Sequence, residues 1–462
     1  MVMNLNDAPL GHAFEGDYPE NYGDLTRRYQ QILQRQVDEL DRTSSSSGPA
    51  EILGILKGRR SARDDLAQLE IRSRADGSAS LLGRGEIVMP AKSCEAEGVA
   101  DLMRSRGFTE RTPHTDYVRW RQPTRFRDGV ERLLEECSAL GAESWPNYVA
   151  TLAAVGKGIG GPEPVPGPGS FADYRIPTAP EYHTGPGPRV AVIDTGIPSL
   201  DPDGGHPGMR RGDAWLSDIP RTDSNRDLLD DLPAGPDGSL DFHAGHGTFV
   251  AGIIQRVAPG ADIQVYRAAD SDGFATDGDI ANALLQAVDD GARIVNLSLG
   301  ARTADDRPPR AMATAVRDIR RKSGDDVVIV AAAGNYGDKS RCWPAALDGV
   351  EAVAGLTAQL APASWSSCGE HIRFSTVAEG IRSTFVTGRE SPVFDPEPEE
   401  FPQDAWALWS GTSFATPQIA GAVARICHEL TLNPRQAVDK LHERGRPIAG
   451  FGKAMRILEG IR

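Results

Sequence analysis

A helix near the carboxyl end of the chain is predicted to open with Gly411-Thr412-Ser413-Phe414-Ala415-Thr416-Pro417. The residues that follow it as far as Ile426 are small or apolar apart from Gln418 and Arg425, which is typical of a helix packed on several sides. Ser413 lies at the helix N-terminus, where free N–H groups favour developing negative charge. We expect Pro417 to fall within about the first turn, where a missing N–H does least harm. A serine at such a position is most often only an N-cap, so the rest of the chain decides whether it does more.

Two other stretches carry the groups that would turn this serine into a nucleophile, namely a base and a carboxylate that orients the base. The apolar run at 189–193 ends in Asp194, as a buried parallel strand would, and a carboxylate there faces the crevice at the carboxyl edge of a sheet. His246 stands between two glycines at the start of an apolar helix predicted over 246–257. Taken singly, Asp194 reads as a strand-end cap and His246 as a helix-start residue.

In the order Asp, His, Ser these motifs resemble the subtilisin family of serine proteases. The resemblance covers about 189–461 and includes the Asp-Thr-Gly strand end, the Gly-His-Gly-Thr-x-Val-Ala-Gly helix and the Gly-Thr-Ser-x-Ala-x-Pro helix. It also includes Ala332-Ala333-Gly334-Asn335, where the family keeps an asparagine that stabilises the oxyanion. The Gly-x-Ser-x-Gly elbow is absent around Ser413, which disfavours an α/β-hydrolase.

The resemblance implies a mechanism and assigns its residues. Ser413 would attack the scissile carbonyl, His246 would take its proton and return it to the leaving amine, and Asp194 would fix the imidazole tautomer. The side-chain amide of Asn335 and a backbone N–H would stabilise the oxyanion. On its own Asn335 would be a turn residue, which is common for asparagine.

The resemblance also implies where a substrate binds, as an extended strand along existing strand edges. One edge would be Ser298-Leu299-Gly300, and the specificity pocket would lie between it and Ala332-Ala333-Gly334. Ala301 stands where the family often has a second glycine, which leaves the width of the pocket open. Cys342 and Cys368 belong to segments that the family brings near this pocket, and whether they pair or are separate buried thiols stays open.

Four acidic residues flank the presumed second substrate edge: Asp270, Asp272, Asp277 and Asp279. They could bind basic residues or calcium, but their spacing lacks the loop pattern of a known calcium site. We interpret them as part of a solvated loop. No metal and no cofactor is therefore predicted, with calcium left open.

Composition narrows the class of protein. The chain has 462 residues and a net charge of −15 with no basic cluster, which argues against nucleic acid as a partner. No apolar run reaches about eighteen residues, so no membrane helix is predicted. The stretch 1–22 lacks the features of a secretory signal, and five cysteines fit a reducing compartment, so we expect a cytoplasmic protein.

The chain divides into three predicted parts: a small α+β N-terminal domain at 1–155, which is either pro-segment-like or a partner-recognition module, a Gly/Pro-rich linker at 156–188, and a subtilisin-like catalytic domain at 189–462. In the first part the patterns predict strands at 70–74, 78–82, 86–89 and 117–120, and helices at 21–42, 94–106, 126–140 and 145–155. In the third part alternating elements predict an α/β fold with a doubly wound, mostly parallel sheet. Its strands are expected at 190–194, 263–267, 294–298, 327–332 and 350–354, and its helices at 246–257, 279–289, 309–322, 413–430 and 434–444.

Three functions remain open at this stage. The favoured one is a serine endopeptidase acting on peptide or protein substrates, since all four chemical groups are present. The second is a narrow processing protease that its N-terminal domain regulates by docking on the catalytic domain. The third is a catalytically silent peptide-binding or scaffolding protein whose cleft the N-terminal domain blocks.

Overall fold

The structure is a computed structural model, and the residues that it describes are 34, 37–38, 48–61, 63, 65–73, 79–111, 115–122, 130–152, 165–166, 187–199, 216, 218–231, 237–303, 305–394, 398–401 and 406–458. Most of the helix predicted over 21–42 and most of the linker predicted over 156–188 lie outside these residues.

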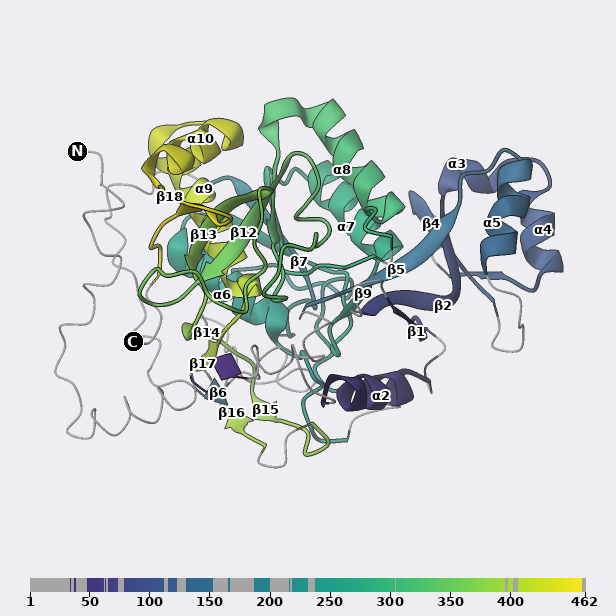
Figure 1. Cartoon of the computed structure of the whole chain (residues 1–462), viewed down its shortest axis with the longest axis horizontal. Coiled ribbons are helices and arrows are strands. Elements are labelled where there is room, and N and C mark those ends of the chain that lie inside the picture. The colour runs from purple at the N-terminus through teal and green to yellow at the C-terminus, as the bar shows by residue number, and fades with distance from the viewer. Residues whose placement is uncertain are drawn as a thin grey trace.

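An eight-stranded sheet forms the centre of the larger part of the molecule (Figure 1). Its order is β18-β19-β13-β12-β11-β10-β7-β8, and all neighbours run parallel except the β18–β19 pair. The strands are β7 (Arg189–Asp194), β8 (Asp262–Arg267), β10 (Ile294–Leu297), β11 (Val328–Ala332), β12 (Val350–Leu356), β13 (Ile372–Val377), β18 (Arg446–Ile448) and β19 (Gly452–Ala454).

Helices cover both faces of this sheet because its strands are apolar on both sides. On β7, Val190 and Val192 belong to the cluster that packs against α6 (His246–Val257), α9 (Thr412–Leu430) and α10 (Pro434–Arg444). Ala191 and Ile193, which point the other way, belong to the cluster with α7 (Asp277–Asp289) and α8 (Arg310–Ser323). The five strands and five helices predicted for this part all lie within two residues of their predicted bounds.

Several smaller elements border the sheet. β14 (Ile381–Thr384), β17 (Trp406–Trp409) and β6 (Val165–Pro166) form a three-stranded antiparallel sheet, so this piece of the predicted linker is an edge strand. β15 (Gly388–Arg389) pairs with β16 (Glu400–Phe401), and a short 3₁₀ helix covers Gly324–Asp326. Among the helices of the described residues none is long and apolar enough to span a bilayer.

The N-terminal part contains a second, antiparallel sheet in the order β3-β4-β2-β5-β9, with β1 paired to β2. Its elements are β1 (Leu69–Ser73), β2 (Ala79–Pro90), β3 (Thr109–Glu110), β4 (Tyr117–Arg121), β5 (Trp145–Thr151), α3 (Ala91–Cys94), α4 (Val99–Ser105) and α5 (Val130–Ala139). β9 (Phe274–Thr276) comes from the segment just before α7. A separate helix, α2 (Gly48–Ser61), lies below β1 and β9 in the view of Figure 1.

Two of the helix predictions for this part are wrong. The helix expected over 94–106 is two short helices, because Gly98 takes a left-handed conformation (φ 84°) and separates α3 from α4. The segment 145–155 is not a helix: residues 145–151 form β5. Pro146 and the β-branched Val149 and Thr151 suit a strand, and the edges of β2 and β9 lie on either side to pair with it.

Candidate active site

The predicted carboxylate and base are in direct contact. Asp194 ends β7 and His246 begins α6, and the His246 Nδ1 lies 2.8 Å from the Asp194 Oδ1, with both side chains buried. The same Oδ1 accepts a hydrogen bond of 2.8 Å from the Thr195 N–H. Gly247 permits this approach, since a Cβ there would lie 2.3 Å from the Gly196 carbonyl oxygen.

A second buried aspartate braces this pair, and the sequence patterns did not single it out. Asp227 Oδ2 accepts hydrogen bonds from the Thr195 hydroxyl (2.9 Å) and from the Gly245 N–H (3.1 Å), while Thr195 Oγ1 accepts from the Gly247 N–H (3.0 Å). Burial raises the pKa of Asp227 to about 6. Asp227 therefore ties the end of β7 to the start of α6.

Aromatic rings close one side of His246. The rings of Trp409 and Phe414 have their centroids 5.3 Å from that of the imidazole, and Trp409 also stacks on His243 at 6.2 Å. Burial, together with the neighbouring His246, lowers the pKa of His243 to about 3, so His243 is neutral around pH 7. This wall removes water from the imidazole on that side.

Ser413 is the second residue of α9 and lies at the end of β10. Its Oγ lies 3.0 Å from the Leu152 carbonyl oxygen and 3.0 Å from the Ser298 carbonyl oxygen, and it donates to these rather than to His246. The expectation for Pro417 needs correction, because this proline is inside α9, beyond its first turn. The N–H that it lacks would have bonded the Ser413 carbonyl, which instead accepts a hydrogen bond of 2.7 Å from the Ser298 hydroxyl.

Asn335, the predicted oxyanion donor, lies against the start of α9. Its Oδ1 accepts from the Thr412 N–H (2.9 Å) and from the Thr412 hydroxyl (2.8 Å), which fixes the amide plane. Within the described residues its Nδ2 makes no hydrogen bond, and so remains available as a donor beside Ser413. Backbone N–H groups of the first turn of α9 are the second source of donors.

The strand β5 fills the cleft along both predicted edges. On one side Thr151 and Gly300 exchange two backbone hydrogen bonds of 3.0 Å. On the other side β5 pairs antiparallel with β9, and the Leu152 N–H donates to the Gly273 carbonyl at 3.1 Å. The only local signal in favour of this strand is the pair of β-branched residues Val149 and Thr151, and nothing in the stretch shows that its partners lie far along the chain.

The predicted pocket residues come together around a small cavity. The space between its walls is about 230 Å³, part of it open to solvent, and it is lined by Leu299, Gly300, Ala332, Gly334, Asn335, Ser413, Thr151, Leu152, Tyr336, Cys342 and Thr412. Ala333 is buried under it in the core, and Ser298 contributes its backbone. The Cys342 thiol narrows the pocket, since a Cβ on Gly300 would lie 2.3 Å from its sulfur. Cys342 and Cys368 do not pair, and all five cysteines are free thiols.

The interpretation of the four aspartates near β9 as a solvated loop is wrong. Asp270, Asp272 and Asp277 are buried, and Asp279 is partly buried. Asp277 accepts the N–H groups of Ala311 and Met312 at the start of α8, at 3.0 and 2.8 Å. The carboxylates of Asp270 and Asp272 bind arginines of α2, more than 200 residues earlier, which a local reading could not foresee.

Within the described residues no group of three His, Cys, Asp or Glu side chains is arranged to hold a metal ion.

Comparisons with known proteins find relatives of the larger part of the chain. A sequence model of the subtilase family matches residues 185–440, which is more than half of the chain. The chain is 29% identical over 253 residues to a thermostable alkaline protease of Halalkalibacterium halodurans, covering 52% of this chain and 57% of that protein. It is 28% identical over 290 residues to thermitase of Thermoactinomyces vulgaris, covering 60% of this chain and 88% of thermitase. The chain thus spans little more than half the length of the first of these relatives.

A solved structure resembles this one over most of its length. The epidermin leader peptide processing serine protease of Staphylococcus aureus aligns with a TM-score of 0.55 at 15% identity, covering 82% of this chain and 98% of that one. At this identity the likeness concerns the fold alone.

Proposed function

The chain belongs to the subtilase family, and from that premise we propose that it is a serine endopeptidase whose cleft is closed by its own N-terminal part. The observation that carries the proposal is the position of the strand β5, which lies in the cleft as a peptide substrate would. The carbonyl of Leu152, the residue that follows β5, accepts a hydrogen bond from the Ser413 hydroxyl. The Asp194–His246 contact of 2.8 Å lies next to it.

In the proposed mechanism Ser413 Oγ attacks the scissile carbonyl and its proton passes to the Nε2 of His246. Asp194 accepts the Nδ1–H of His246, which holds the tautomer whose Nε2 is free to act as a base. The oxyanion that forms takes hydrogen bonds from the Asn335 Nδ2 and from a backbone N–H at the start of α9. His246 then gives its proton to the leaving amine, and water repeats the cycle on the acyl-enzyme.

The N-terminal part regulates this activity by occupying the cleft. Contacts outside the cleft support this role: Asn282 of α7 exchanges two hydrogen bonds with the backbone of Tyr117 (3.0 and 2.9 Å), and Arg119 pairs with Asp279 at 3.0 Å. In this arrangement Ser413 donates to the Leu152 carbonyl rather than to His246. The serine is therefore held away from its base until β5 leaves or is cut.

A narrow specificity, as in a protease that processes one kind of peptide, fits the small pocket. The space of about 230 Å³ between Gly300 and Gly334 is shared with β5 and limited by the Cys342 sulfur. A side chain that enters it has to be small, or has to displace Cys342.

The second candidate function is a silent peptide-binding protein, and the missing Ser413–His246 hydrogen bond favours it. A fluorophosphonate probe decides between the two, because only a serine that its histidine activates reacts with it. We expect the full chain to become labelled at Ser413, and Ser413→Ala and Asp194→Asn to remain unlabelled. If the folded full chain stays unlabelled even after β5 has been displaced, the silent function is the correct one.

A further inference from the structure

Three buried aspartates lie beside the substrate edge at β9, and the mechanism uses none of them. Asp241 lies five residues before His246, and Asp270 and Asp272 lie in the turn that leads into β9. Their relative exposures are 4%, 8% and 1%. Buried carboxylates are rare unless something compensates their charge, so their partners indicate what this place accepts.

Each carboxylate uses one oxygen to hold its own loop. Asp241 Oδ2 accepts from the Ser271 hydroxyl and the Asp231 N–H, at 2.7 and 2.8 Å. Asp270 Oδ1 accepts from the N–H groups of Asp272 (3.1 Å) and Phe274 (3.3 Å). Asp272 Oδ1 accepts from the Phe242 N–H at 3.2 Å. These bonds lie within the catalytic part, and they orient the second oxygen of each carboxylate.

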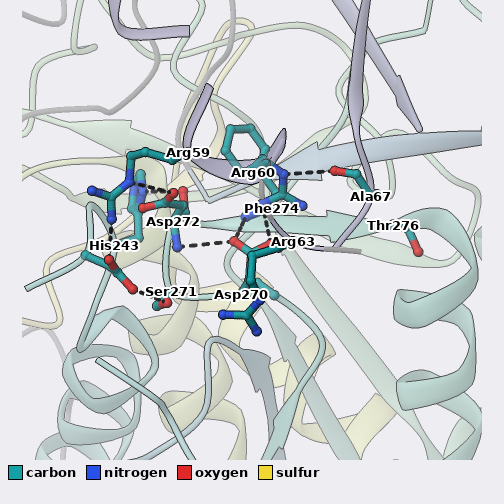
Figure 2. A network of polar contacts seen from close by, with 12 residues as sticks. Arg59, Arg60, Arg63, Ala67, His243, Asp270, Ser271, Asp272, Phe274 and Thr276 are labelled. Atoms are coloured by element: carbon teal, nitrogen blue, oxygen red, sulfur yellow. Dashed lines mark hydrogen bonds and ion pairs between the residues drawn. The ribbon is translucent and has the colours of Figure 1, made fainter. Parts of the chain in front are cut away.

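The second oxygens all bind guanidinium groups of α2, and Figure 2 shows Asp270 and Asp272 beside these arginines. Arg59 donates to Asp241 Oδ1 and to Asp272 Oδ2, and Arg60 donates to Asp270 Oδ2. Arg60 is 2% exposed, and its Nε also donates to the Ala67 carbonyl at 2.9 Å. Two neighbouring arginines of the N-terminal part thus fill a site that the catalytic part has built.

The Arg60 guanidinium also lies over the ring of Phe274, the first residue of β9, at 4.8 Å from the ring centroid. Phe274 belongs to a small cluster with Val149 of β5 and Leu56 of α2. The side chain at the position of Val149 therefore points to the ring on which Arg60 stacks. When α2 and β5 give way to a substrate, a long side chain at that position reaches the space that Arg60 vacates.

We propose that Phe274 and Asp270 form a subsite for an arginine of the substrate, at the position that Val149 of β5 now occupies. The inference rests on the proposed endopeptidase function and adds to it a preference at one substrate position. Arginine fits better than lysine, because a planar guanidinium stacks on the ring and still donates sideways to the carboxylate. A substrate guanidinium there would replace the charge-assisted hydrogen bond that the Asp270 Oδ2 now accepts from Arg60, and a neutral side chain could not replace it.

The test measures binding, so that it does not depend on catalysis. The protein is the full chain with Ser413→Ala, with Arg60→Ala to empty the subsite, and with Thr151→Pro to loosen β5. Fluorescent peptides copy residues 146–155 and carry arginine, citrulline or the native valine at position 149. Citrulline has the shape of arginine without its charge. We expect a Kd about tenfold lower for the arginine peptide than for the citrulline peptide, by fluorescence anisotropy.

Asp270→Asn is the matched variant, since its amide oxygen can keep accepting from the N–H groups of Asp272 and Phe274. In this variant the ratio of the two Kd values should fall to about one. Equal Kd values for arginine and citrulline peptides before this substitution would overturn the proposal. Absence of serine labelling in the opened chain that keeps Ser413 would instead count against the endopeptidase function and leave these Kd values meaningful.

A second measurement serves if the opened protein does not fold. Arg60→Ala in the full chain should lower the thermal midpoint, and adding Val149→Arg should recover part of the loss by placing a guanidinium over Phe274. Val149→Met is the neutral control and should recover nothing. Equal midpoints for the arginine and methionine variants would contradict the proposed subsite.

Discussion

Thr151 and Gly300 exchange two backbone hydrogen bonds of 3.0 Å, and this pair places the end of β5 beside the nucleophile. Leu152, the next residue, has its carbonyl 3.0 Å from Ser413 Oγ. The N-terminal part therefore ends, within the described residues, where a substrate would be cut. If the enzyme acts on its own chain, the cut should fall within one residue of Leu152, and intact-mass measurement of the two fragments checks it.

Ser298 and Pro417 are expected to be coupled in their effect on stability. Ser298→Ala leaves the buried Ser413 carbonyl without its hydrogen bond and should cost about 1–3 kcal/mol in the free energy of unfolding. Pro417→Ala restores an N–H that can bond the same carbonyl. The double variant should therefore lose less than the sum of the single losses, as measured by denaturant unfolding. If the losses in unfolding free energy were strictly additive, the two substitutions would not act on the hydrogen bonding of the same carbonyl oxygen.

The third expectation concerns the pH dependence of stability that Asp227 contributes. Burial raises its pKa to about 6 in the folded protein, above the unfolded value of about 3.9. The folded state then binds more protons between these values, so this group lowers stability as the pH rises from about 4 to about 6, by up to about 3 kcal/mol.

Asp227→Asn removes this titration while an amide oxygen can still accept from Thr195 and Gly245. As the pH rises across that range, the unfolding free energy of the native protein should therefore fall relative to that of the variant. A difference that stays constant from pH 4 to pH 7 would contradict the burial argument.

Asn335 tests the oxyanion site. In a protein opened by Thr151→Pro, Asn335→Ala should lower kcat by about 10²–10³ with little change in KM, because the donor acts on charge that forms only in the transition state. That factor is the one known for subtilisin itself, a member of this family. Thr412→Val removes one hydrogen bond that orients the amide, without removing the donor, and should cost less than about tenfold. Equal losses in the two variants would assign Asn335 a structural role only.

Much of this site could be predicted because its chemistry is local in sequence. Asp194, His246, Asn335 and Ser413 each stand at the end of a strand or the start of a helix whose apolar pattern is clear. The strand β5 could not be predicted, because its pairing partners Gly300 and β9 lie more than 100 residues away and a short stretch such as 145–155 suits a helix equally well. The prediction for the aspartates near β9 was wrong for the same reason, because the arginines that compensate their negative charge, Arg59 and Arg60, lie on a helix far away in the sequence.

Cys342 should set the size of the side chain that the pocket accepts. The Cys342 sulfur lies so close to Gly300 that a Cβ on that glycine would clash with it. Cys342→Gly removes this sulfur and so deepens the pocket, whose space is about 230 Å³. In the opened protein, the ratio of kcat/KM for a phenylalanine substrate to that for an alanine substrate should rise by about tenfold or more. An unchanged ratio would mean that another residue limits the pocket.

The central claim is that an active serine is held shut by β5, and fluorophosphonate labelling of Thr151→Pro tests it most directly. This substitution removes the N–H that bonds Gly300 and should loosen the strand, whereas Arg132→Ala on the exposed face of α5 should not. Intact-mass measurement should show that Thr151→Pro gains the label at least about tenfold faster than the native chain and the Arg132→Ala control. A tenfold change corresponds to a loss of about 1.4 kcal/mol in the free energy that holds β5 in the cleft. Thr151→Pro with Ser413→Ala should gain none. Equal labelling rates in the native chain and Thr151→Pro, or labelling that survives Ser413→Ala, would contradict the account.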